Sequence, residues 1–286
     1  PRVAVAEAWV PAERRTRYAS KEPLGQAFNF DLLAAPWSAK KFKKSIGFNL
    51  DLSEKSGSSS TWVLSNHDVI RHATRYGLPK KTNFDKWVMT DGHSPELDME
   101  KGQLRARAAT MLLLALPGST YMYKGEELGL FEVADLPGNV LQDPIWLRDG
   151  KTHKGRDGCR VPLPWEAGAG VANGFNTTGK SWLPQPANYR TFARNLQDGV
   201  AGSTLELYKR LLKERKAFGM GSGEFRWAEE FQDKNTLAYI NNGLLVIFNF
   251  GPDAVVLPAG EVLVTTQHDL TAERELEHDQ VVWIKL

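Results

Sequence analysis

The sequence predicts an α/β fold of parallel strands and helices, followed by a small domain of antiparallel strands. Four short apolar runs alternate with segments of helical periodicity, as in consecutive βα units, and these runs cover residues 3–8, 26–30, 61–64 and 119–123. From about Gly219 onward, the period of the apolar residues changes from 3.6 to 2. In that region Asn242 and Gly243 form a strong hairpin signal between two apolar runs. We therefore expect two domains, residues 1–218 and 219–286.

Composition excludes several classes of protein and of site. The 286 residues are 42% hydrophobic and carry a net charge of +2, which provides a large core and implies no nucleic-acid partner. No apolar run approaches the roughly 20 residues that a membrane helix needs. The single cysteine, Cys159, excludes an internal disulfide and leaves no cysteine metal cluster. Nine Trp and seven Tyr fit either sugar binding, because aromatic faces pack against sugar rings, or a large core.

The elements of the first 64 residues follow from their periodicity. Residues 3–8 form a strand that Pro11 stops, and residues 11–18 form a loop and the start of a helix. A short aromatic strand at 26–30 precedes a basic amphipathic helix at 39–52, in which Phe42 and Ile46 recur at helical spacing. The lysines between these apolar positions form a solvated face. A polar connector at 55–60 then leads into an apolar, β-branched strand at 61–64.

The next segments are one long irregular stretch, further helices and one strand. Residues 69–95 are irregular, residues 99–116 form a helix that Pro117 and Gly118 end, and residues 119–123 form the fourth strand. Residues 130–186 form a long loop, which we expect to fold across the strand ends because Trp146, Leu147, Trp165 and Trp182 would otherwise be exposed. Helices at 189–196 and 204–216 complete this domain. Short strands follow at 236–241, 243–250, 255–257, 262–266 and 281–286.

The polar stretch after the third strand is the strongest candidate for a functional site. Ser65, Asn66, His67 and Asp68 end an apolar run abruptly, and the carboxyl ends of parallel strands are where α/β enzymes present reactive side chains. The alternative is an ordinary polar turn in which Asp68 caps the following segment. The residues alone leave both interpretations open.

Glu7 is a second candidate, at the end of the first strand. A carboxylate in an apolar context is costly unless it is paired or protonated, and such a context favours the protonated form that a general acid needs. The alternative is a structural ion pair with Arg14 or Arg15 in the loop beyond.

Four segments, in order, resemble signatures of the α-amylase family of glycoside hydrolases, in its α-glucosidase and oligo-1,6-glucosidase branch. Residues 5–9 are similar to the segment that carries the family's general acid, and residues 64–68 to its last short signature. Residues 123–130 resemble the end of its eighth barrel strand. Residues 156–165 resemble the following loop in the α-glucosidase and trehalose-synthase branch. The resemblance implies the C-terminal half of a (β/α)8 TIM barrel, from strand 5 onward, followed by a small antiparallel β-sandwich domain.

The resemblance also implies a retaining cleavage of α-glucosidic bonds by two carboxylates. By this resemblance Glu7 is the acid and base, and Asp68 stabilises the oxocarbenium-like transition state without acting as nucleophile. His67 hydrogen-bonds sugar hydroxyls. Arg156 or Arg160 contacts the non-reducing-end sugar; the alternative for both arginines is structural pairing with a nearby carboxylate, at position 143, 149 or 157.

The chain departs from the family pattern in two places. No Gly-Phe-Arg-x-Asp segment, which carries the family's nucleophile, occurs here. We therefore expect Pro1 to be an internal residue of a longer protein, the nucleophile to lie in the missing N-terminal half, and this chain alone to be inactive. The resemblance implies no cofactor or metal in this chain and leaves a calcium site in the missing half open. Lys124 stands where the family pattern commonly has Gln, and we expect this difference to have little effect on function.

Three functions follow. The first is part of an α-glucosidase, cytoplasmic, acting on terminal glucose of maltose- or isomaltose-type oligosaccharides with the missing half as partner. The second is a trehalose-synthase-type isomerase or transglucosylase. The third is a non-catalytic homologue, such as the heavy subunit of an amino-acid transporter, which the presence of Glu7, His67 and Asp68 disfavours.

Overall fold

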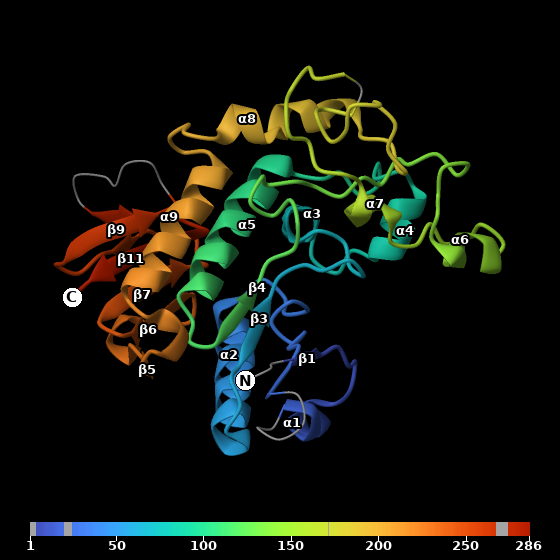
Figure 1. Ribbon diagram of the computed structural model, residues 1–286. Helices are drawn as coiled ribbons and strands as arrows, with labels where there is room; N and C mark the ends of the chain where they lie inside the picture. The colour runs from blue at the N-terminus through green and yellow to red at the C-terminus, as the bar shows by residue number, and fades with distance from the viewer. Residues whose placement is uncertain (1–3, 20–24, 171, 267–273) are drawn as a thin grey trace. The chain divides into compact units, whose positions relative to one another are not determined.

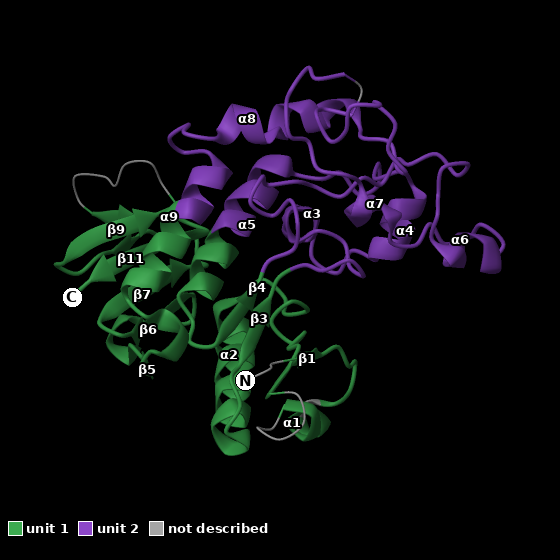
Figure 2. Cartoon of the chain, viewed as in Figure 1, with its two compact units in different colours: residues 1–64, 108–121, 210–286 green, residues 65–107, 122–209 purple. Residues whose placement is uncertain are grey.

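The structure, a computed structural model, describes residues 4–19, 25–170, 172–266 and 274–286. It contains two compact units, shown in Figure 2. Unit 1 comprises residues 1–64, 108–121 and 210–286, and unit 2 comprises residues 65–107 and 122–209. Helices α5 (Met99–Leu114) and α9 (Thr204–Ala217) each begin in unit 2 and end in unit 1. Over the described parts of the chain, no helix combines the length and the hydrophobicity needed to cross a membrane.

The N-terminal part of unit 1 contains a first pair of parallel strands. β1 (Ala4–Ala6) pairs with β2 (Gly25–Ala27), and helix α1 (Ala12–Ala19) lies between them in sequence. Helix α2 (Ala39–Ser56) continues four residues beyond its predicted end. It stops at Gly57, which adopts φ +63° and donates its N–H to the carbonyls of the last turn. Residues 55 and 56, predicted as connector, therefore belong to the helix.

The third and fourth strands form a second parallel pair, separate from the first. β3 (Thr61–Val63) pairs with β4 (Ser119–Tyr121). Between β2 and β3, a side chain replaces the backbone ladder: the Thr61 hydroxyl donates to Ala27 O at 2.7 Å and accepts from Asn29 N at 3.0 Å. Each predicted strand is thus present and pairs in parallel with one neighbour, but each is only three residues long: β1 ends at Ala6 instead of residue 8, and β2 lies at 25–27 instead of 26–30.

A five-stranded antiparallel sheet makes up most of the C-terminal part of unit 1 (Figure 1). Its order is β5-β6-β7-β11-β9, and β8 pairs with β10 in a separate ribbon. Asn242 and Gly243, both at positive φ, form the predicted turn between β6 and β7. The strand bounds are Phe225–Trp227, Thr236–Asn241, Leu244–Asn249, Val255–Val256, Glu261–Thr265, Glu275–Leu276 and Gln280–Lys285 for β5 to β11. Short 3-10 helices lie at Met220–Ser222 and Glu229–Phe231.

This sheet is buried on both faces, which explains the apolar character of its central strands. On one face, the Tyr239 hydroxyl donates to Leu112 O and Trp283 Nε1 donates to Met111 O, so the sheet packs against the end of α5. The other face contributes Ala238, Ile247 and Val282 to a core that includes residues of β8 and β10. The end of α5, which we assigned to the first domain, lies in the same compact unit as this sheet. The compact units therefore divide the chain differently from the predicted domains, and the domain boundary between residues 218 and 219 stays a prediction.

In the described residues of unit 2, short helices surround small apolar cores. The predicted loop at 130–186 folds around a core that includes Leu130, Val133 and Val161. Three of the large apolar side chains of this loop do not belong to the core. Leu147, Trp165 and Trp182 are exposed, so the expectation that they would be buried was wrong. The stretch 69–95, expected to be irregular, contains two helices. The helices of unit 2 besides α5 and α9 are His72–Gly77, Phe84–Met89, Pro144–Arg148, Asp157–Arg160, Ala187–Phe192 (3-10) and Arg194–Gln197, labelled α3, α4, α6, α7, η1 and α8.

Arg215 of α9 gives the first testable prediction, because its guanidinium bonds the carbonyl oxygens at the end of α5. Nη1 donates to Leu114 O at 2.6 Å and to Leu116 O at 2.7 Å. Arg215→Met should lower the free energy of unfolding by about 1–3 kcal/mol, since the carbonyls lose charged donors. Urea unfolding measures this change. Lys213→Met, at an exposed position of the same helix, is the control and should stay within about 0.5 kcal/mol; equal losses in both variants would contradict the capping role.

Candidate functional site

Residues 65–72 form a loop that is closed at its two ends. Ser65, just after β3, accepts a hydrogen bond from the backbone N of His72, the first residue of α3, at 2.9 Å. The Ser65 hydroxyl also lies 2.9 Å from His72 Nδ1. Burial, with the nearby charges of Arg75 and Arg71, lowers the pKa of His72 to about 3, so the ring is neutral and accepts the serine proton. The pair fixes the polar stretch between its ends.

Asp68 lies in this loop, and two arginines bind its carboxylate. Arg156 Nη1 donates to Asp68 Oδ1 at 2.7 Å, and Arg160 Nη2 donates to the same oxygen at 3.2 Å. His67 Nε2 lies 3.5 Å from that oxygen. Helix α3 begins at His72 with Arg71 as its N-cap, so Asp68 is not the cap of the next segment and the capping interpretation was wrong.

Arg156 connects Asp68 to a second carboxylate, Asp143. Its Nε donates to Asp143 Oδ2 at 2.6 Å, and its backbone N donates to the same oxygen at 3.1 Å. Burial alone would raise the pKa of Asp143, but the hydrogen bonds from Arg156 and Ile145 outweigh it and hold the pKa at about 2. Asp143 is therefore an anion that orients Arg156. Both interpretations of this arginine apply, since it contacts a structural carboxylate and the candidate one.

Arg160, which contacts Asp68, also lies close to His67 and Asp143. Its Nε donates to the backbone oxygen of His67 at 2.9 Å, and its Nη1 lies 4.0 Å from Asp143 Oδ2. Four of the five residues predicted for the site, His67, Asp68, Arg156 and Arg160, thus lie in unit 2 and contact one another. We call the group of His67, Asp68, Asp143, Arg156 and Arg160 the Asp68 cluster. Its two carboxylates are balanced by two guanidinium groups.

Arg71, a buried arginine that was not predicted as a site residue, contacts the residue that precedes Arg160. The backbone N of Arg71 donates to Glu132 Oε2 at 3.0 Å. Its guanidinium donates to Lys124 O at 2.7 Å and to Cys159 O at 2.8 Å. Burial raises the pKa of Glu132 to about 7, against the hydrogen bond from Arg71. The available signal was a charged residue three positions after Asp68, next to the start of α3.

Glu7 lies in unit 1, as the first residue after β1, and its side chain is exposed. The expected burial in an apolar strand was wrong, because the strand ends at Ala6. The proposed ion pair with Arg15 is also absent from the described contacts of Arg15, which binds Asp31 and Asn29. Trp9 is exposed beside it, and its ring stacks on Phe30 at a centroid distance of 4.0 Å. An acid next to an exposed aromatic face suits a sugar ligand.

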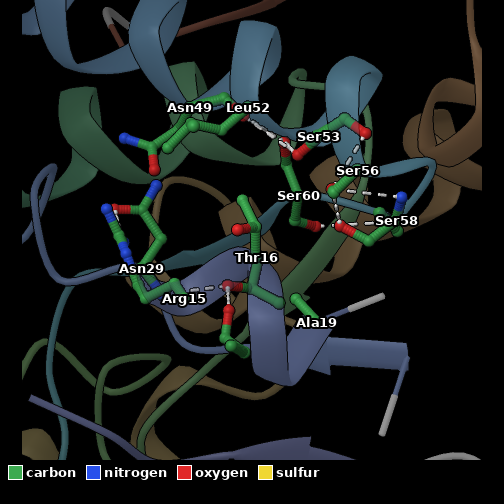
Figure 3. Close-up of a pocket in the computed structure, with 13 residues that line it drawn as sticks. Arg15, Thr16, Ala19, Asn29, Asn49, Leu52, Ser53, Ser56, Ser58 and Ser60 are labelled. Atoms are coloured by element: carbon green, nitrogen blue, oxygen red, sulfur yellow. Dashed lines mark hydrogen bonds between the residues drawn. The ribbon is translucent and has the colours of Figure 1, made fainter. Parts of the chain in front are cut away.

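Unit 1 also contains a polar cavity of about 40 Å³, which none of the predicted site residues lines (Figure 3). Hydroxyl and amide groups from α1, the segment after β2, the end of α2 and the segment before β3 line it, with Asn29, Ser53 and Ser60 among them. A cavity of this size accommodates a few water molecules. Because none of the candidate catalytic residues lines the cavity, we assign it no part in the candidate site.

Comparison with known proteins relates the chain to carbohydrate-active enzymes. A model of the family described as alpha amylase, catalytic domain, matches residues 13–220. A probable alpha-glucosidase of Rhizobium meliloti is 34% identical over 169 residues, which are 59% of this chain and 26% of that protein. An amino acid transporter heavy chain of Mus musculus is 27% identical over 204 residues, which are 68% of this chain and 28% of that protein.

A solved structure extends the similarity to nearly the whole chain. The alpha-glucosyl transfer enzyme XgtA has 27% sequence identity and a TM-score of 0.72, and the match covers 99% of this chain and 51% of that one. The chain thus spans about a quarter to a half of the length of these proteins.

Asp143 provides a prediction about pH. Because its folded pKa of about 2 lies below the unfolded value of about 3.9, its contribution to stability is present above about pH 4 and is lost as the pH falls toward 2. Asp143→Asn should lower the free energy of unfolding by about 1–3 kcal/mol at pH 7, and by less at pH 3. Urea unfolding of both proteins at pH 7, 4 and 3 measures the difference. Asp149→Asn, at an exposed carboxylate of the same loop, is the control; a deficit independent of pH would refute the ionic role.

Proposed function

The chain belongs to the α-amylase family of glycoside hydrolases, and we propose that it forms part of a retaining α-glucosidase that removes terminal α-linked glucose from maltose- or isomaltose-type oligosaccharides. We infer that β1 to β4 are the second half of a (β/α)8 barrel. The order of the strands, their parallel pairing and the antiparallel sheet that follows support this inference.

The observation that carries the proposal is the environment of Asp68. Its carboxylate lies in the loop that follows β3, and Arg156 and Arg160 orient it through one oxygen. A carboxylate held as an anion stabilises positive charge that develops on a sugar ring during cleavage. His67 is half exposed beside it and can donate to a sugar hydroxyl. Arg156 and Arg160 would then act mainly on Asp68, with Arg156 also free to face the sugar at its exposed edge.

Glu7 is proposed as the general acid and base. Its position at the first residue after β1 is where a parallel strand presents a reactive side chain. Because the Glu7 side chain is exposed here, a bound sugar or a neighbouring segment would have to exclude water from the carboxyl during the reaction.

The nucleophilic carboxylate is proposed to come from outside these 286 residues. The sequence has no Gly-Phe-Arg-x-Asp segment. The chain also spans about half of its structural relative, so a complete enzyme of this kind contains further residues. The proposed partner of this chain is therefore an N-terminal half of the same protein.

Two other functions have specific support. The similarity to an enzyme described as an alpha-glucosyl transfer enzyme favours transfer of glucose to an acceptor other than water. The similarity to a transporter heavy chain favours a binding role without catalysis. Product analysis with maltose, on a protein that also contains the N-terminal half, separates them: glucose indicates hydrolysis, a new disaccharide indicates transfer or isomerisation, and unchanged maltose indicates a binding protein.

Glu7→Gln tests the acid in a protein that also contains the N-terminal half. Gln cannot donate a proton, so the rate on an unactivated glucoside should fall by about 10²–10⁴-fold. A nitrophenyl glucoside, whose leaving group needs little protonation, should lose less in the first step. Equal losses on both substrates would argue for a structural Glu7. The 286-residue chain alone is the control, and robust hydrolysis by it would contradict an external nucleophile.

Asp68→Asn tests the charge that stabilises the transition state. Asn keeps the size of the side chain but removes its negative charge, so kcat should fall by at least about 10²-fold with KM little changed, since only the transition state loses an interaction. Steady-state kinetics on maltose measure this, with the melting temperature recorded alongside. Asp149→Asn, at an exposed carboxylate of the same unit, is the control. A kcat near that of the wild type would refute the role of Asp68.

A further inference from the structure

Three consecutive carbonyl oxygens at the end of α7 accept hydrogen bonds from side chains. Cys159 O accepts from Arg71 Nη2 at 2.8 Å and from the Tyr123 hydroxyl at 3.1 Å. Lys124 Nζ donates to Arg160 O at 3.2 Å and to Val161 O at 2.9 Å. The carbonyls at the end of a helix have no partner within the helix, so external donors decide how firmly this turn is held.

The three donors come from two places that flank the candidate site. Arg71 precedes α3 directly and lies three residues after Asp68, whereas Tyr123 and Lys124 follow β4. Arg71 is buried, and its guanidinium also binds Lys124 O at 2.7 Å. Burial raises the pKa of the Tyr123 phenol, so its hydroxyl keeps the proton that it donates. The donors and acceptors therefore form one connected group.

The turn held in this way carries the arginine that orients Asp68. Arg160 has its backbone carbonyl bound to Lys124, while its guanidinium donates to Asp68 Oδ1 and to His67 O. A long, flexible side chain reaches a fixed target reproducibly only when its backbone is fixed. A shift of the 159–161 backbone would thus change the contact between Arg160 and Asp68.

We propose that Arg71, Tyr123 and Lys124 form a carbonyl clamp on residues 159–161 that aims Arg160 at Asp68. The three are positioning residues, and the catalytic meaning of the clamp rests on the proposed function. Lys124 then matters more than sequence analysis indicated. A Gln at this position carries an NH₂ group and can hold a carbonyl, whereas Lys adds a positive charge that strengthens both bonds.

Hydrogen exchange at Arg160 Nε tests the clamp in the 286-residue chain, because this N–H donates to His67 O. Arginine-selective ¹⁵N labelling provides the signals, and Arg160→Lys assigns the one that belongs to Arg160. Tyr123→Phe and Lys124→Met should each accelerate exchange of this proton by about 2–10-fold, the equivalent of one net hydrogen bond. Lys124→Gln should restore part of the protection, because its amide replaces the missing donor.

Two controls separate aiming from general stability. Lys80→Met, at an exposed lysine of unit 2, should leave the Arg160 signal unchanged. The single cysteine provides an independent measure, since opening of α7 exposes the buried Cys159 thiol and should raise its alkylation rate in the same variants. Acceleration confined to Arg160 Nε–H and Cys159 supports the clamp. Unchanged exchange at Arg160, or equal acceleration at every arginine, would overturn it.

This experiment is independent of enzymatic activity, because it involves no sugar. If the clamp variants behave as expected and the longer protein hydrolyses no glucoside, the clamp stands and the proposed function fails. If the longer protein is active but Arg160 is insensitive to all the clamp variants, the proposed function stands and the clamp is rejected.

Discussion

The candidate site depends on one buried charge, the guanidinium of Arg71. A buried cation is costly unless hydrogen bonds replace its lost water, and here two carbonyl oxygens from separate segments do so. Because those carbonyls belong to residues 124 and 159, solvating the charge holds the segment around Lys124 and helix α7 against Arg71, at the end of the loop that contains Asp68. The requirement to pair Arg71 thus organises three segments that are far apart in the sequence.

Local signals accounted for much of the fold. Strand β6 has the predicted bounds, and its turn at Asn242 and Gly243 was readable because a tight hairpin depends on only two residues. Helices α3 and α4 were missed because they are short, and because α3 buries the polar residues His72 and Thr74 rather than presenting an apolar stripe. Periodicity reports which residues are apolar; it does not report which polar residues will find buried partners.

The sequence predicted most of the residues that form the site, but it did not predict which of them contact one another. Resemblance to a family identified His67, Asp68, Arg156 and Arg160, and the structure places these four together. The partner of the arginines could not be chosen from the sequence, because three aspartates lie close by along the chain. The fold decides: Asp157 accepts backbone N–H groups of residues 142 and 143, which leaves Asp143 to face Arg156. The exposure of Glu7 was missed since it depends on where a three-residue strand ends.

The charge balance of the Asp68 cluster has a consequence for how a ligand would reach it. Two aspartates and two arginines sum to zero, so the cluster creates only a short-range field that fades within a few ångströms of the surface. Such a site exerts no long-range steering on ions and gains nothing by attracting charged solutes. Uncharged ligands would encounter it by diffusion alone, and association should proceed at nearly the same rate in dilute buffer and in concentrated salt.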